Sequence, residues 1–241
     1  MKIDKEVLER IKKAETAFAL TGAGSSAPSG IPTFRGSEGF WKDKTPFSVE
    51  MFKENPQIVW EWHIEIKNLI KKAKPNASHF TLAKMQKFFK DFAVITQNID
   101  NLHQEAGSDK VIELHGNIYR NKCNDCGKKY GEIDTKEIPK CEECGGLVRP
   151  DVVWFGEPLP YDALLEARRY AERSELCFVI GTSGVVQPAA SIPLIAKEYG
   201  AFVVEVNIEE TVLSRYLDYS IFGDVSIVLP ELYEELLKNG G

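Results

Sequence analysis

The chain has 241 residues, of which 43% are hydrophobic and 27% are charged. These values are typical of a globular protein, and the length allows one large domain or a domain with a small insert. Acidic residues outnumber basic residues 36 to 30, so the net charge of −6 argues against a nucleic-acid partner. Apolar runs are too short for a membrane span and the N-terminus lacks a signal peptide's apolar core, so we expect a cytoplasmic protein.

Four short apolar runs predict buried strands, and amphipathic patterns predict helices between them. The strands are expected at residues 18–20, 92–95, 177–180 and 202–206. The helices are expected after Asp4, along one face with Ile58, Trp62, Ile66 and Leu69, after Asn76, and at residues 188–199 and 229–238. This alternation indicates an α/β fold with a Rossmann-like, doubly wound parallel sheet.

A polar or glycine-rich cluster follows each predicted strand: TGAGSSAPSG, TQNID, GTSGVVQP and NIEE. Parallel strands end at one edge of a sheet, so the four clusters are expected to line one ligand-binding crevice. In the first cluster, Gly22, Gly24 and Ala27 fit a relaxed GxGxxG/A dinucleotide pattern. A plain turn explains this motif equally well by itself, and the usual acidic ribose partner is missing. The strand-end groups at 181–183 and 207–209 suit an adenine and its ribose, or are ordinary turns.

The second cluster belongs to the stretch TQNIDNLHQEAGSDKVIELHG, which brings five polar side chains together behind one apolar run. They are Gln97, Asn98, Asp100, His103 and His115. Amides, a carboxylate and imidazoles in this density are typical of an active site, and imidazole suits proton transfer near neutral pH. We interpret His103, like His79, as a structural histidine.

A cysteine quartet follows this stretch, with Cys123 and Cys126 separated by fourteen residues from Cys141 and Cys144. The spacing predicts a structural zinc site with four thiolate ligands and no open coordination position, in an inserted lobe at about residues 122–149. The alternative is a pair of unrelated redox CxxC motifs. The fifth cysteine, Cys177, is expected to be a small buried hydrophobe.

Taken together, GAGSSAPSGIPTFRG, TQNIDNLH, HG at His115, the CxxC pairs, RPDVVWFGE and GTSGVVQPAA resemble the sirtuins, the Sir2-type NAD-dependent protein deacylases. The match runs in order from Thr21 to Asn207 and is closest to compact prokaryotic or archaeal members. It departs from the family at Ser25, usually aliphatic, and at Thr33, often Asp; we expect both changes to loosen the cofactor loop.

The resemblance implies one catalytic domain of two lobes. The large Rossmann-like lobe would comprise about residues 1–35, 75–118 and 150–241, and the small lobe about 36–74 with the zinc ribbon at 119–149. It also implies NAD as co-substrate, structural Zn²⁺, acyl-lysine peptides as partners, and His115 as general base with Asn98 as the second catalytic residue. A monomer is compatible with this organisation.

By similarity, the cofactor contacts are Gly22, Ala23, Gly24, Ser26, Thr33, Phe34, Arg35, Gln97, Asn98, Ile99, Asp100, Gly181, Thr182, Ser183, Asn207, Ile208, Glu209 and Val225. The substrate contacts are His63, Ile66, Val152, Val153, Phe155, Gly156 and Val186. The backbone at residues 152–156 would pair with the substrate as an added strand. Succinyl-preferring members resemble one another in a Tyr-x-x-Arg pair that this chain replaces with His63 and Ile66, so we expect neutral acyl groups as substrates.

The sequence leaves three functions open. The first is an NAD-dependent lysine deacylase that transfers the acyl group to ADP-ribose and releases nicotinamide. A protein mono-ADP-ribosyltransferase is the second, and a noncatalytic module that binds NAD or ADP-ribose is the third. The set Gln97, Asn98, Asp100 and His115 favours an enzyme, because a binding module has no need of a base.

Overall fold

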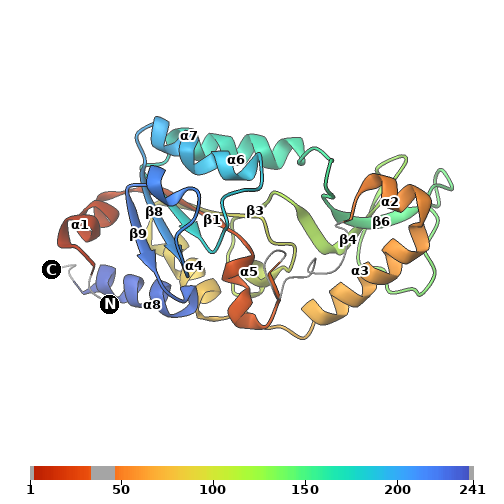
Figure 1. The fold of residues 1–241 in the computed structure, drawn as a ribbon, viewed down its shortest axis with the longest axis horizontal. Coiled ribbons are helices and arrows are strands. Elements are labelled where there is room, and N and C mark those ends of the chain that lie inside the picture. The colour runs from red at the N-terminus through yellow and green to blue at the C-terminus, as the bar shows by residue number, and fades with distance from the viewer. Residues whose placement is uncertain (1–2, 34–46, 239–241) are drawn as a thin grey trace.

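The computed structural model describes residues 3–33 and 47–238, which are built around a six-stranded parallel sheet (Figure 1). In spatial order its strands are β3 (Val111–Glu113), β2 (Asp91–Thr96), β1 (Thr16–Thr21), β7 (Leu176–Ile180), β8 (Phe202–Asn207) and β9 (Tyr219–Phe222). This is the order of doubly wound dinucleotide-binding sheets, in which the chain reverses direction of winding between β1 and β7. The four predicted strands are confirmed as β1, β2, β7 and β8, and the predicted fold class is confirmed with them.

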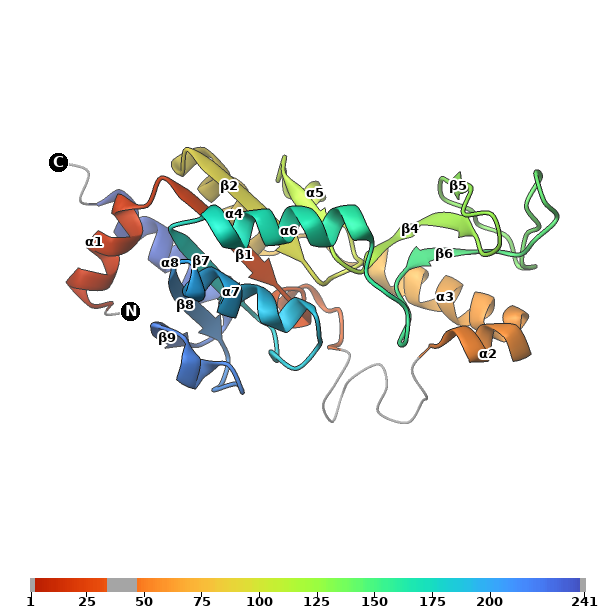
Figure 2. The same ribbon diagram turned by 90° about the horizontal axis from the view of Figure 1, so that it is seen from above.

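Helices cover both faces of this sheet (Figure 2). One face carries α1 (Lys5–Lys13), α4 (Ala77–Phe88) and α8 (Val225–Leu237), and the other carries α6 (Tyr161–Arg173) and α7 (Ile192–Glu198). The strands between them are apolar on both sides, and β7 has five consecutive buried residues, including Cys177. Cys177 is therefore a buried hydrophobe, as predicted, and burial raises the pKa of its thiol.

Polar side chains define where two of these helices begin. Asn76 accepts a hydrogen bond from Ser78 N and forms a capping box with His79 at the start of α4. Asp224 accepts from Ser226 N at the start of α8, four residues earlier than the sequence pattern indicates. Asp4 occupies the N-cap of α1, but its side chain makes no cap hydrogen bond there.

A second, three-stranded antiparallel sheet lies at the end of the molecule opposite the chain termini (Figure 1). Its strands in spatial order are β5 (Lys129–Tyr130), β4 (Gly116–Cys123) and β6 (Val148–Val152). The helices α2 (Val49–Glu54) and α3 (Pro56–Ile70) lie against this sheet, and a separate apolar cluster that includes Phe52, Val59 and Trp154 joins them to it. This part of the chain therefore has its own core.

The predicted apolar face of α3 is wrong. Ile58 and Leu69 are 47% and 37% exposed, and Trp62 and Ile66 are only partly buried. The buried stripe consists of Val59, Trp60, His63, Lys67 and Ile70. Two polar members of this stripe are tolerated because they find partners: His63 meets Trp154, and Lys67 donates to the carbonyl of Ile133 at 2.7 Å.

Several elements are absent from the sequence predictions. They are α2, α6, the short α5 (Leu102–Glu105), the edge strands β3 and β9, and the three strands of the small sheet. The helix predicted at residues 188–199 is a short 3-10 turn, Ala189–Ser191, followed by α7. Among the described residues, no helix combines the length and the apolar character that crossing a bilayer requires.

Candidate active site

The turn after β1 packs directly against the turn after β7. Gly24 N donates to Gly181 O at 2.8 Å, and Gly22 N donates to Ile180 O at 3.0 Å. A Cβ on Gly24 would lie 2.8 Å from Gly181 O, and a Cβ on Gly181 would lie 2.5 Å from Ser25 N. Gly181 also has a φ of +57°, which favours glycine. These glycines are therefore needed for close backbone packing at the point where the sheet reverses its winding.

Asn98 ties this turn to the loop after β2. Its Nδ2 lies 3.1 Å from Gly22 O and 3.0 Å from the hydroxyl oxygens of both Ser25 and Ser26. The Ser25 hydroxyl is fully buried and donates to Gly22 O at 2.8 Å. The Ser25 hydroxyl therefore adds hydrogen bonds inside the turn, and the expectation that this serine loosens the cofactor loop stays a prediction.

Asp100 completes this buried network. Its Oδ2 accepts from the Ser26 hydroxyl at 2.6 Å, and its Oδ1 accepts from Leu102 N at 3.0 Å. Burial raises the pKa of Asp100, and the hydrogen bonds from Ser26 and Leu102 partly oppose the rise. Asn98, Ser26 and Asp100 are thus held in one arrangement by their mutual contacts.

A second chain of hydrogen bonds joins three strand ends. Gln97, after β2, donates to the Thr182 hydroxyl at 2.9 Å. Asn207, at the end of β8, donates to the Thr182 carbonyl at 2.9 Å. The polar groups after β1, β2, β7 and β8 therefore meet at one edge of the sheet, as the sequence predicts.

His115 lies between the two sheets, in the junction from β3 to β4. Its Nδ1 is 2.9 Å from the carbonyl oxygen of Gln97, so the neutral imidazole carries its proton on Nδ1 and donates it to that carbonyl. Nε2 is then the unprotonated nitrogen. Burial lowers the pKa of His115, and the hydrogen bond to Gln97 partly opposes this. The arrangement can accept a proton at Nε2 at neutral pH.

The remaining predicted cofactor contacts differ in environment. Ala23 and Ile99 line a small pocket together with Ser26, Asn98 and Asp100. Ser183, Ile208 and Glu209 are exposed next to Thr182 and Asn207. Val225 is buried in the apolar core at the start of α8, away from solvent. Thr33 is the last described residue before the gap, and Phe34 and Arg35 lie outside the described residues.

Two histidines beneath the site are structural in their contacts. The rings of His79 and His103 are 4.8 Å apart and both side chains are buried. His103 Nε2 is 2.9 Å from the Thr21 hydroxyl, and His79 Nε2 is 3.4 Å from the Ser26 hydroxyl. Desolvation lowers the pKa of both imidazoles, that of His79 to about 4. The sequence indicates their structural character but not that they support Thr21 and Ser26.

The segment at residues 152–156 runs out of β6 beside His115. Val153 N donates to His115 O at 2.9 Å, and Phe155 N donates to Phe47 O at 3.1 Å. Val152 is buried, whereas Phe155 is 49% exposed and Gly156 has a φ of +88°. Among the predicted substrate contacts in this segment, Val153 is hydrogen-bonded to the backbone of the candidate base, and the exposed residues Phe155 and Gly156 follow two and three positions later. Val186 is half-buried in the loop after β7.

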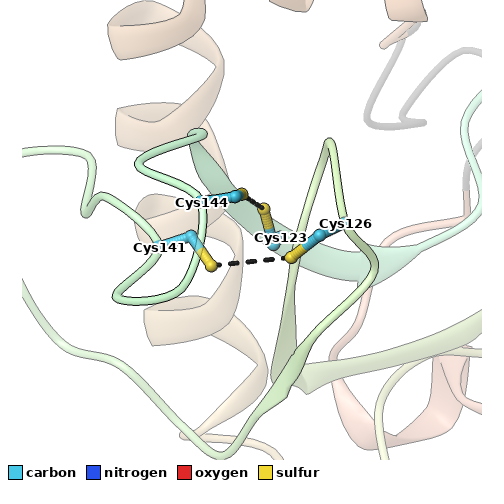
Figure 3. A group of neighbouring side chains, drawn as sticks. All are labelled: Cys123, Cys126, Cys141 and Cys144. Carbon is cyan, nitrogen blue, oxygen red and sulfur yellow. Dashed lines mark hydrogen bonds between the residues drawn. The ribbon is translucent and has the colours of Figure 1, made fainter.

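The four paired cysteines converge, with two sulfurs coming from each CxxC pair (Figure 3). All four Sγ atoms lie within 4.8 Å of one another; Cys123 and Cys144 are 3.5 Å apart, and Cys126 and Cys141 are 3.6 Å apart. Sulfurs at about 2.3 Å from a tetrahedral zinc are roughly 3.8 Å apart, so this set fits Zn²⁺ and leaves no ligand position open. Tyr130 donates to Cys141 Sγ at 3.1 Å from the adjacent strand β5.

A larger cleft of about 350 Å³ lies between α6 and the small sheet. Its lining includes Glu113, Arg120, Asp151 and Glu166. It contains none of the strand-end groups at 22–26, 97–100 or 181–183, so the size of a cavity alone does not locate the chemistry here.

A doubly wound sheet with converging polar strand ends, a neutral histidine and a four-thiolate lobe defines a dinucleotide-binding enzyme with a structural metal site. The Sir2 family model matches residues 22–188, and the chain belongs to the Sir2 family.

Relatives and solved structures agree with this membership. The NAD-dependent protein deacylase of Aquifex aeolicus is 51% identical, with 92% of this chain and 95% of that protein aligned. The NAD-dependent protein deacylase of Pyrococcus furiosus is 47% identical, with 97% and 98% aligned. A crystal structure of a Sir2 homolog with NAD is 41% identical and superposes with a TM-score of 0.92, over 98% of this chain and 95% of that one. A Sir2 structure with a p53 peptide and NAD⁺ is 40% identical, with a TM-score of 0.87 over 98% of both chains.

Proposed function

We propose that this protein is an NAD-dependent protein-lysine deacylase that transfers an acyl group from lysine to ADP-ribose and releases nicotinamide. The observation that carries the proposal is His115, whose Nδ1 proton is committed to the Gln97 carbonyl and whose Nε2 is left as a base. A module that only binds NAD does not need such a group. The relatives from Aquifex aeolicus and Pyrococcus furiosus are both named NAD-dependent protein deacylases, which supports the proposal.

The strand-end groups suit the binding of NAD. The turn at residues 22–26 directly follows β1, where a pyrophosphate binds in doubly wound folds, and its two glycines allow the cofactor to approach the backbone closely. Gln97, Asn98 and Asp100 orient the nicotinamide ribose, and their fixed hydrogen bonds reduce the entropy lost on reaching a reactive geometry. Bound NAD supplies a glycosidic bond with nicotinamide as leaving group and the ribose hydroxyls that receive the acyl group.

The protein's own part in the chemistry is positioning and proton transfer. The acyl-lysine chain would pair with residues 152–156, which would place the acyl oxygen beside the ribose carbon that nicotinamide leaves, so that this oxygen bonds to that carbon. His115 Nε2 would then take the proton of the adjacent ribose hydroxyl as the hydroxyl oxygen bonds to the acyl carbon; the bond from that carbon to the lysine nitrogen breaks, lysine leaves as the amine, and one water completes the release of acylated ADP-ribose. The proposed two-lobe division puts both substrates at the junction that His115 occupies.

The acyl group is proposed to be neutral. His63 donates from Nδ1 to Val59 O at 2.8 Å, and its Nε2 accepts from Trp154 Nε1 at 3.3 Å. Both ring nitrogens are used in the neutral form, and burial lowers the pKa of His63 to about 4. Ile66 offers no charge. A succinyl carboxylate therefore has no cation at these two positions and loses hydration without compensation.

Incubation with NAD and an acetyl-lysine peptide, followed by mass spectrometry, tests the function. A deacylase yields deacetylated peptide, nicotinamide and acetylated ADP-ribose in equal amounts. A mono-ADP-ribosyltransferase adds the mass of ADP-ribose to a protein, and a noncatalytic module leaves NAD unconsumed. Either of the last two outcomes contradicts the proposal.

A further inference from the structure

A tight turn at residues 154–157 ends the segment that is proposed to pair with the substrate. Glu157 N donates to Trp154 O at 3.1 Å, and Trp154 N donates back to Glu157 Oε2 at 2.9 Å. The turn is thus closed twice, once by the backbone and once by the carboxylate. Gly156, with its φ of +88°, permits the reversal.

Arg149 holds the same carboxylate from inside β6. Its Nη1 donates to Glu157 Oε1 at 2.6 Å, and its Nη2 donates to Glu157 Oε2 at 2.8 Å and to Val152 O at 2.8 Å. The Arg149 side chain is 2% exposed and that of Glu157 is 19% exposed. Burial acts to raise the pKa of Glu157, but the hydrogen bonds from Arg149 and Trp154 outweigh it, so the pKa is lowered and the group is a carboxylate.

Trp154 is fixed on its other sides as well. The guanidinium carbon of Arg149 lies 3.2 Å from the centre of its ring, and the ring of Phe52 lies 5.0 Å away. The indole N–H donates to His63, whose ring stacks on Phe47 with the centroids 4.2 Å apart. Helix α3 and residue 47 therefore support the turn from the side opposite the solvent.

The two residues that flank Trp154 present the segment to the site. Val153 is bound to the backbone of His115, and Phe155 to the backbone of Phe47, in both cases through their N–H groups. The parallel bridge between Ser48 and Phe155 engages the backbone of Phe155, whereas Gly156 N has no hydrogen-bond partner among the described residues. A free N–H donor at an exposed turn, held at a fixed distance from the candidate base, can bond the backbone of an added strand.

We propose that Arg149 and Glu157 are positioning residues that lock the turn at residues 154–157, so that the free N–H of Gly156 registers an acyl-lysine peptide against His115. This inference rests on the proposed function. The two residues act through the backbone of Trp154, Phe155 and Gly156 and do not touch the reacting atoms.

The geometry requires a guanidinium and a carboxylate in particular. Arginine presents a planar fork that bonds both carboxylate oxygens and still reaches Val152 O, whereas a lysine offers a single ammonium that cannot span the three acceptors. A glutamine at position 157 keeps the shape, but its amide NH₂ replaces one of the two acceptor oxygens. Arg149 then loses one acceptor in either amide orientation, and Trp154 N loses its acceptor in one of them.

The test compares Glu157→Gln and Arg149→Lys with wild type in steady-state deacetylation. The substrates are an acetyl-lysine peptide and a single acetyl-lysine with blocked ends, which offers few backbone partners. Glu172→Gln is the matched control, because it breaks an exposed Arg168–Glu172 pair of 2.6 Å in α6. A further variant, Arg149→Met with Glu157→Met, removes both buried charges together and so avoids leaving one of them uncompensated if a single variant fails to fold.

We call the Arg149–Glu157 pair the clasp. In the clasp variants Glu157→Gln and Arg149→Lys, KM for the peptide should rise about tenfold or more, because charge-assisted hydrogen bonds are lost. The values of kcat, zinc content and KM for NAD should stay within about twofold of wild type. Efficiency with the single acetyl-lysine should change much less, and Glu172→Gln should behave as wild type. An equal loss on both substrates, or an equal rise of KM for NAD, overturns the positioning role.

Hydrogen exchange separates this inference from the proposed function. The hydrogen-bonded amides of Val153, Trp154, Phe155 and Glu157 should exchange slowly in wild type and faster in Glu157→Gln, while those of β1 and β7 keep their protection. If wild type removes no acetyl group, the proposed function is wrong, and hydrogen exchange alone tests whether Arg149 and Glu157 lock the turn. Unchanged exchange in Glu157→Gln overturns that locking role.

Discussion

His115 and Gln97 are joined by a hydrogen bond of 2.9 Å from the imidazole Nδ1 to the backbone carbonyl, and this one contact selects the tautomer of the candidate base. Gln97 also donates from its side chain to Thr182, so the residue that orients the base belongs to the chain of strand-end groups. Gln97 therefore connects the tautomer of His115 with the polar groups at the strand ends.

The first prediction concerns the pH dependence of the rate. Burial lowers the pKa of His115 below its ordinary 6.5, so the neutral base predominates above that value. We expect kcat/KM for the acetyl-lysine peptide to be level from about pH 7 to 8 and to fall as pH drops below 6.5, because protonation of Nε2 removes the base. An acid limb with its midpoint above about 7 would contradict the environment described for His115.

Replacing the base should separate chemistry from binding. His115→Ala is expected to lower the deacetylation rate by about 10²- to 10⁴-fold, the usual contribution of a positioned base, while NAD binding measured by calorimetry stays close to wild type. Asn98→Ala should also be severe and should weaken NAD binding too, because Asn98 bonds Gly22, Ser25 and Ser26 in the turn. A His115→Ala protein that deacetylates at the wild-type rate would remove His115 from the mechanism.

Loss of one thiolate should affect folding as well as activity. Cys141→Ala leaves three ligands in a closed four-ligand set, and structural zinc binding contributes directly to the free energy of folding. We expect this variant to purify with little zinc and a lower Tm, as measured by metal analysis and calorimetry. Cys177→Ala is the control, because this buried cysteine lies in β7 outside the quartet; it should keep its zinc. Zinc-free wild-type protein would refute the metal assignment.

Acyl preference is decided by comparing kcat/KM for acetyl and succinyl forms of one peptide at pH 8. The succinyl form is expected to be poorer by tenfold or more, since a carboxylate placed near neutral His63 and Ile66 pays a desolvation penalty of about several kcal/mol without a partner. Equal or higher efficiency with the succinyl peptide would contradict the proposed neutral-acyl preference.

Stability should fall on acidification because two buried histidines are neutral in the folded protein. His63 and His79 have pKa values of about 4 in the folded protein and 6.5 as free groups, so between these limits the unfolded chain binds more protons than the folded chain. The free energy of unfolding is therefore full above pH 6.5 and declines towards pH 4. Chemical denaturation across this range measures the slope, and His63→Gln should make it shallower. An unchanged slope would mean that His63 does not stay neutral.

The sequence by itself determined the features that depend on local pattern. The four apolar runs specify β1, β2, β7 and β8, and the polar clusters after them lie at one edge because parallel strands share their carboxyl ends. The spacing of the paired cysteines identifies the metal ligands, because the tight turn of each CxxC motif places its two sulfurs close together. Gln97, Asn98 and Asp100 were identifiable as polar groups just after a predicted strand, whereas the role of His115 followed from the resemblance to the sirtuins.

Only the tertiary structure decided what depends on partners far apart in the chain. The buried face of α3 includes Val59, His63 and Lys67. His63 accepts a hydrogen bond from Trp154, and Lys67 donates one to the carbonyl of Ile133. Helical periodicity in the sequence cannot reveal these distant partners. The tautomer of His115 depends on a carbonyl eighteen residues away. The pairing of Arg149 with Glu157 depends on a reversal at Gly156, so two charges that look like surface residues in the sequence become a buried ion pair.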